Sequence, residues 1–109
     1  MPKYLIEASY SQEGLKGVVK EGGSGRKTAV EAAVKALGGR LESLYFAFGT
    51  SDIYGIAEMP DNISAAAFAL AVGPTGALAH LKTVDLLTTD EVNQAVKKAS
   101  GASYRPPGH

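Results

Sequence analysis

Alternation of hydrophobic and polar residues along the chain predicts four β-strands. In the first of them, residues 3–10, Tyr4, Ile6 and Ala8 share one face, and more polar positions fall on the other. Gly49-Thr50-Ser51 joins two further strands as a hairpin, and Pro60 ends the second of these. The four predicted strands are Lys3–Tyr10, Arg40–Phe48, Asp52–Met59 and Leu78–Leu87.

Helical spacing of apolar residues predicts a broken helix after the first strand. Ser11 is a suitable N-cap for its first part, and the run Gly22–Gly25 breaks it. A second part begins at a capping box formed by Thr28 and Glu31, or already at Gly25, and ends at the next glycine pair.

Two more helices follow the later strands. An alanine-rich helix over residues 64–72 is capped by Asp61 or Asn62. Thr88 and Glu91 form another capping box, which opens a terminal helix. That helix carries an apolar side at the spacing typical of a core, formed by Val92, Ala95, Val96 and Ala99.

The order of elements predicts an α+β fold of the ferredoxin-like βαββαβ type with an extra C-terminal helix. Right-handed crossovers place the first and third strands in the middle of a four-stranded antiparallel sheet, with helices on one face. The chain has 109 residues, which suits a single domain over residues 1–101 followed by a flexible tail over residues 102–109.

The sheet face without helices is expected to be half apolar. On the third strand, small residues suited to helix packing fall on one side, and Tyr54, Ile56 and Glu58 fall on the other. Because an apolar patch of several hundred Å² is unusual on a soluble monomer, we expect a homodimer formed through this open face.

The composition limits the classes of partner that we expect for this protein. Lys plus Arg and Asp plus Glu both number 11, so the net charge is zero, and we expect no nucleic-acid partner and no membrane attachment. Cysteine is absent, which excludes thiolate chemistry and cysteine metal sites; we expect no metal and no cofactor. The N-terminal residues do not resemble a signal peptide, and we expect a cytoplasmic protein.

The glycine-rich stretch Gly22–Thr28 differs from a phosphate-binding loop. Arg26 separates Gly25 from Lys27-Thr28, and the stretch follows a helix rather than a strand. We interpret it as a break in the helix with a solvated basic start, although the backbone N–H groups of the next helix offer a place for an anion.

Four side chains are candidates for a ligand site: Tyr45, Asp52, Tyr54 and His80. His80 is the only histidine outside the tail, and the alternation places it on one side of its strand with Leu78, Lys82, Val84 and Leu86. Each candidate also has a structural interpretation. Asp52 suits the chemistry of a turn, the tyrosines suit packing, and His80 suits a structural or exposed position.

A family resemblance is carried by five segments: Leu37–Leu41, Tyr45–Gly49, Asp52–Tyr54, Glu58–Asp61 and Leu86–Val92. Together they resemble the GYD-domain family of small bacterial proteins, over nearly the whole chain from Tyr4 to about Val96. In the turn that names the family, Gly49 and Asp52 are present, but Ser51 stands where the tyrosine is expected. The resemblance implies a ferredoxin-like subunit related to dimeric α+β barrels, and it implies no assigned reaction.

Three functions remain open at this point. The first is a homodimeric small-molecule-binding or accessory protein, with a pocket between sheet and helices or between two sheets. The second is a cofactor-free enzyme of the oxygenase or isomerase type, which needs His80 in an enclosed pocket beside a carboxylate. The third is a structural assembly subunit without a pocket.

Overall fold

The computed structural model describes residues 1–109 and contains four strands, three α-helices and one short 3₁₀ turn. They follow the order that the sequence predicts. Their bounds are β1 (Lys3–Tyr10), α1 (Gln12–Ala36), β2 (Arg40–Phe46), β3 (Ile53–Glu58), α2 (Asn62–Val72), the 3₁₀ turn Gly73–Thr75, β4 (Leu78–Leu86) and α3 (Thr89–Ala99).

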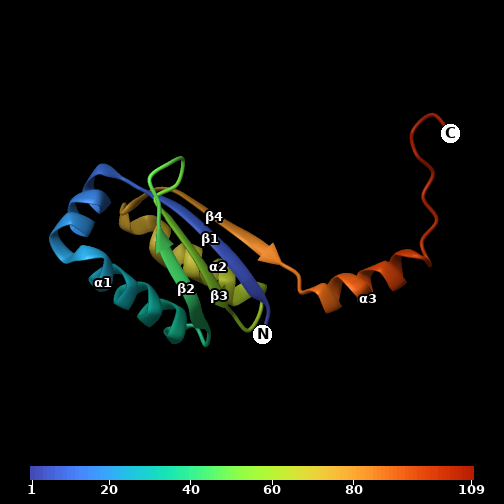
Figure 1. The fold of residues 1–109 in the computed structure, drawn as a ribbon, viewed down its shortest axis with the longest axis horizontal. Coiled ribbons are helices and arrows are strands. Elements are labelled where there is room, and N and C mark those ends of the chain that lie inside the picture. Colours follow the sequence, from blue (N-terminus) through green and yellow to red (C-terminus); the bar gives the residue numbers. More distant parts are fainter.

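The four strands form one antiparallel sheet in the order β2-β3-β1-β4. β1 and β3 therefore lie in the middle, as predicted. Helices α1 and α2 both lie on the same side of this sheet (Figure 1). This arrangement confirms the ferredoxin-like α+β fold and leaves the other sheet face open.

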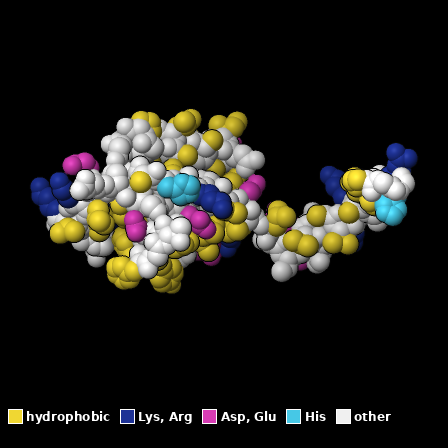
Figure 2. Space-filling model, turned by 90° about the horizontal axis from the view of Figure 1, so that it is seen from above, with side chains coloured by type: hydrophobic (Ala, Val, Ile, Leu, Met, Phe, Trp, Pro, Cys, Tyr) yellow, Lys and Arg dark blue, Asp and Glu magenta, His cyan; other side chains and the backbone are white.

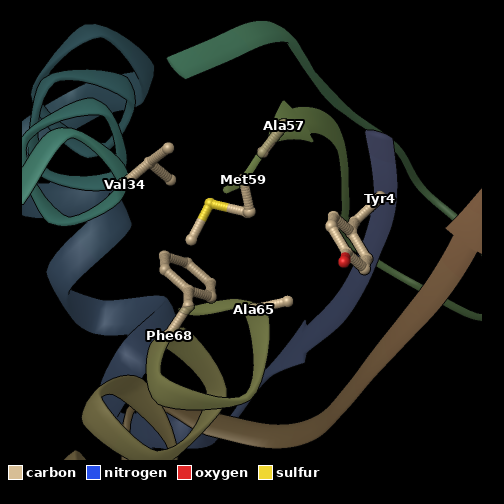
Figure 3. Packing of buried hydrophobic residues seen from close by; sticks show 6 residues of the cluster. All are labelled: Tyr4, Val34, Ala57, Met59, Ala65 and Phe68. Carbon is tan, nitrogen blue, oxygen red and sulfur yellow. The ribbon is translucent and has the colours of Figure 1, made fainter. Parts of the chain in front are cut away.

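The core lies between the sheet and these two helices. Tyr4 of β1 and Ala57 of β3 point toward Val34 of α1 and Phe68 of α2, with Met59 between them (Figure 3). All five side chains are at most 4% exposed. Alternation along β3 turns every second residue toward the helices, and the small residues Gly55 and Ala57 lie on that side, as predicted for close helix packing.

The break in α1 is confirmed but is shorter than predicted. Only Gly22 leaves the helical conformation, with φ 81° and ψ 171°. A positive φ of this kind is readily adopted by glycine because it has no Cβ. Thr28 is already inside the second part of α1, where its hydroxyl donates to the carbonyl of Ser24 at 3.0 Å, so the predicted capping box at this residue is wrong.

Helix α3 begins as predicted but packs against no other part of the chain. The capping box of Thr88 and Glu91 is present, with both hydrogen bonds formed at 2.9 and 3.1 Å. The helix projects away from the sheet (Figure 1), and Val92 and Val96 are 45% and 64% exposed. The expectation that its apolar side joins a core is therefore wrong within one chain. Residues 102–109 after it form no helix or strand.

Candidate functional site

Three of the four predicted site residues lie on the open face of the sheet. Tyr45 of β2 is paired with Tyr54 of β3, so their side chains share that face. Tyr45 is 71% exposed, whereas Tyr54 is half-buried. His80 of β4 is paired with Ser9 of β1 and is exposed. Figure 2 shows a histidine at the surface of the body of the protein.

Asp52 lies in the loop between β2 and β3 and holds that loop against the end of β1. Its carboxylate Oδ2 accepts a hydrogen bond from the backbone N–H of Tyr10 at 2.9 Å. Its own N–H donates to the carbonyl of Ala8 at 2.9 Å, and Ser9 Oγ donates to the carbonyl of Thr50, also at 2.9 Å. Asp52 therefore fixes the loop through contacts with β1, not through the local backbone hydrogen bonds that the turn interpretation predicts.

A β-bulge changes the face of the sheet on which Leu78 lies, a residue that the alternation places on the same side as His80. The pairing of β1 with β4 shifts between Ser9 and Tyr10, so that Tyr10 is paired with Leu78 and residue 79 is skipped. Leu78 consequently lies on the helix-covered face, where it lines the cavity described below. The prediction that Leu78 shares a side with His80 is wrong, because an extra residue in a strand reverses the alternation beyond it.

The open face combines an apolar band with paired charges. Leu5 of β1 lies between its neighbours Ile56 of β3 and Val84 of β4, and all three are only partly exposed. Two ion pairs border this band at one end: Arg40 to Glu58 at 2.8 Å and Lys3 to Glu42 at 3.0 Å. No group of three His, Cys, Asp or Glu side chains gathers on this face or elsewhere to hold a metal ion.

A cavity of about 100 Å³ lies on the other face, between the sheet, α1 and α2. Thirteen of its fifteen lining residues are hydrophobic, and the other two are Gly55 and Arg26. None of the four predicted site residues lines it. Its walls come from all four strands and both covering helices, for example Ile6, Leu41, Leu81 and Phe68.

Two side chains with polar groups, Tyr10 and Arg26, face this apolar cavity. Arg26 follows the Gly22 bend and is paired with Glu21 at 3.2 Å. Burial raises the pKa of the Tyr10 hydroxyl above its usual value, while the neighbouring Arg26 guanidinium acts in the opposite direction. Tyr10 therefore stays protonated at neutral pH.

Arg26 belongs to the stretch that the sequence predicts as a solvated basic helix start, but its side chain is only 28% exposed and lines the cavity. A basic residue closely follows a helix-breaking glycine, and such a break redirects the chain. Its approach to the cavity depends on the angle of the bend at Gly22 and on the end of β1. These are tertiary features, which the spacing of residues does not specify.

The sheet order and the two covering helices define a ferredoxin-like α+β protein. The GYD domain model matches residues 4–96, and the chain belongs to that family. No curated protein matches the sequence. None of the helices combines the length and apolar character needed to cross a membrane.

Proposed function

We propose that the protein binds a small apolar molecule in the cavity between the sheet and helices α1 and α2. The observation that carries this proposal is the lining, in which thirteen of fifteen residues are hydrophobic and Tyr10 and Arg26 supply the polar groups. Ligand sites in proteins are typically of this kind, largely apolar with a few placed polar groups. In another protein, an apolar cavity of about 150 Å³ holds benzene, and the cavity here is of the same order of size.

Two neighbouring alanines of α1 provide a matched test of the cavity. Ala33 lines it, whereas Ala32 is exposed on the outer side of the same helix. Ala33→Met fills the cavity and is expected to abolish binding of small hydrocarbons and alcohols, measured by calorimetry or NMR titration. Ala32→Met makes the same substitution outside the cavity and is expected to leave binding intact. Equal binding by both variants would contradict the proposal.

We further propose that two copies pair through the open sheet face. The chain exposes 7516 Å², whereas a compact monomer of 11.3 kDa exposes about 5,700 Å². Much of this difference comes from α3 and residues 102–109, which project from the body and are exposed throughout (Figure 1), so the case for this face rests on its own side chains. The apolar band of Leu5, Ile56 and Val84 is the surface that supports sheet-to-sheet pairing.

The pairing is tested by placing one charge on either of two apolar surfaces. Ile56→Glu introduces a carboxylate into the apolar band, and sedimentation is expected to show a monomer of 11.3 kDa in place of the dimer. Ile63→Glu is the control, because Ile63 is 80% exposed at the start of α2, on the other side of the sheet. A wild-type chain that sediments as a monomer at micromolar concentration would contradict the dimer.

The enzyme hypothesis has less support than binding. It needs His80 in an enclosed pocket beside a carboxylate, but His80 is exposed and is not among the cavity residues. The carboxylate of Asp52 is already engaged by the N–H of Tyr10. An assembly subunit without a pocket is likewise less well supported, since the cavity exists in the single chain.

A further inference from the structure

Tyr10 and Arg26 line two hollows at once. They belong to the apolar cavity between sheet and helices, and they also line a more polar hollow on the surface, together with Glu13, Thr75 and neighbouring residues. The two side chains therefore stand where the cavity meets the surface. A molecule whose apolar part fills the cavity has its other end beside the Arg26 guanidinium and the Tyr10 hydroxyl.

We propose that the cavity selects a small apolar monocarboxylate, whose hydrocarbon chain lies in the cavity and whose carboxylate contacts Arg26 and Tyr10. This inference rests on the proposed function, since it names the class of ligand for the same site. A guanidinium offers five N–H donors in a planar arrangement that matches a carboxylate. The phenol adds one O–H donor.

The existing partner of Arg26 does not prevent this contact. Arg26 Nη1 is 3.2 Å from Glu21 Oε2, and the side chains of Arg26 and Glu21 are 28% and 48% exposed. An ion pair this open to water contributes little stability. The Arg26 guanidinium has five N–H donors, more than its contacts with Glu21 and the Tyr10 hydroxyl use, so donors remain for a second carboxylate. Glu21 then competes with the ligand for the guanidinium.

The surrounding charges favour a single negative charge on the ligand. Arg26 is the only cationic residue among those lining the cavity and the surface hollow. Glu13 lines the hollow as well, and both Glu21 and Asp52 act on Tyr10 electrostatically. A dicarboxylate or a phosphate ester brings further negative charge toward these acidic groups, whereas a monocarboxylate is matched by Arg26 alone.

The size of the cavity limits the hydrocarbon part. Its volume of about 100 Å³ is smaller than the roughly 150 Å³ cavity that holds benzene. A chain of about four to six carbon atoms is therefore the expected length. A longer chain places its carboxylate beyond Arg26 and Tyr10, in water, and gains little further burial.

Pentanoate and 1-pentanol are suitable probes, because they share the chain and differ in the charged group. At pH 7, calorimetry is expected to show pentanoate binding about tenfold or more tightly than 1-pentanol. Arg26→Met, which keeps the aliphatic part of the side chain but removes the guanidinium, is expected to lower pentanoate affinity about tenfold and 1-pentanol affinity much less, so that the preference is lost. Near-ultraviolet circular dichroism checks that the variant is folded.

Glu21→Gln provides a second variant with the opposite expected sign. Removal of the competing carboxylate is expected to raise pentanoate affinity a few-fold without changing 1-pentanol affinity. Equal affinity of the wild-type protein for the two probes, or a preference that survives Arg26→Met, overturns the monocarboxylate inference while binding itself stands. Failure of both probes to bind overturns the proposed function and this inference with it.

Discussion

The two faces of β3 are built from alternate residues of one six-residue strand, yet they have different surroundings. Ile53 and Ala57 face α1 and α2 and are 6% and 0% exposed. Tyr54, Ile56 and Glu58 face outward and are only partly covered, by their neighbours within the sheet. One chain therefore completes the helix-covered face of its sheet and leaves the open face incomplete.

Helix α3 sharpens this difference. It is a capped amphipathic helix, but it projects from the body with hydrophobic side chains uncovered (Figure 2) and covers neither face. Amphipathic helices ordinarily gain most of their stability by packing their apolar side. The apolar groups on the two faces therefore have different surroundings. On the helix-covered face they form the core and the cavity, and on the open face they stay uncovered and form the surface of the proposed dimer.

The largest difference between the faces is expected from two isoleucines of β3. Ile53→Ala removes a buried side chain and is expected to lower the free energy of unfolding by about 2–5 kcal/mol at any protein concentration. Ile56→Ala, on the open face, is expected to cost less in the monomer, and its cost should grow with protein concentration because it weakens the dimer. Urea denaturation at two protein concentrations measures the loss of stability in both variants. Equal losses that do not depend on protein concentration would contradict the different roles of the two faces.

Two glycines extend the comparison to the backbone. A Cβ added at Gly39 would clash with the carbonyl oxygen of Glu58 and would lie 2.6 Å from the sulfur of Met59. Gly39→Ala is therefore expected to lower the free energy of unfolding by about 1–3 kcal/mol. A Cβ added at Gly17, in the exposed first part of α1, meets no atom within 4 Å. Gly17→Ala is therefore expected to raise the free energy of unfolding by about 0.4–1 kcal/mol. Thermal and urea unfolding of the two variants should show opposite signs.

The smallest effect is expected from the hydroxyl of Tyr4 on the helix-covered face. Burial raises the pKa of Tyr4, and the nearby carboxylates of Asp85 and Asp61 raise it further. Since the folded pKa lies above the unfolded value of about 10, the associated stability is complete below that pH and is lost as pH rises through the folded pKa.

Unfolding measured between neutral pH and pH 11 tests this effect. The wild-type protein is expected to lose stability at the alkaline end more steeply than Tyr4→Phe, which lacks the titrating hydroxyl. The hydroxyl also donates a hydrogen bond to Oδ1 of Asn62, so the variant starts from a slightly lower stability at neutral pH. Parallel curves for the two proteins would argue against a buried, late-titrating Tyr4.

Residue patterns predict the sheet well because β1 and β3 are rich in strand-forming residues and their turns are marked by glycine and proline. They fail where local rules meet tertiary geometry. Leu78 changes face because of a bulge that no spacing indicates, and the apolar side of α3 predicts a buried face without telling which surface covers it. Arg26 reaches the cavity only through the bend at Gly22.

The positions of the predicted site residues likewise depend on tertiary structure that residue patterns do not specify. Tyr45, Tyr54 and His80 are polar or aromatic residues on strands, and the alternation alone does not say which face contains a cavity. The structure puts them on the face opposite the cavity, where they remain candidates for contact with a second copy. The cavity itself is formed by ordinary apolar side chains, which no motif distinguishes from core.

The central claim is that a ligand enters the helix-covered side while the open side faces a second copy. Methyl NMR spectra recorded during titration with pentanoate test it most directly. Saturable shifts are expected at the methyl groups that line the cavity, and the open-face methyl groups are expected to stay unchanged. Saturable shifts confined to the open face, or no saturable shifts at all, would contradict it. The cavity reporters are Val30, Leu41 and Leu81, and the open-face reporters are Leu5, Ile56 and Val84.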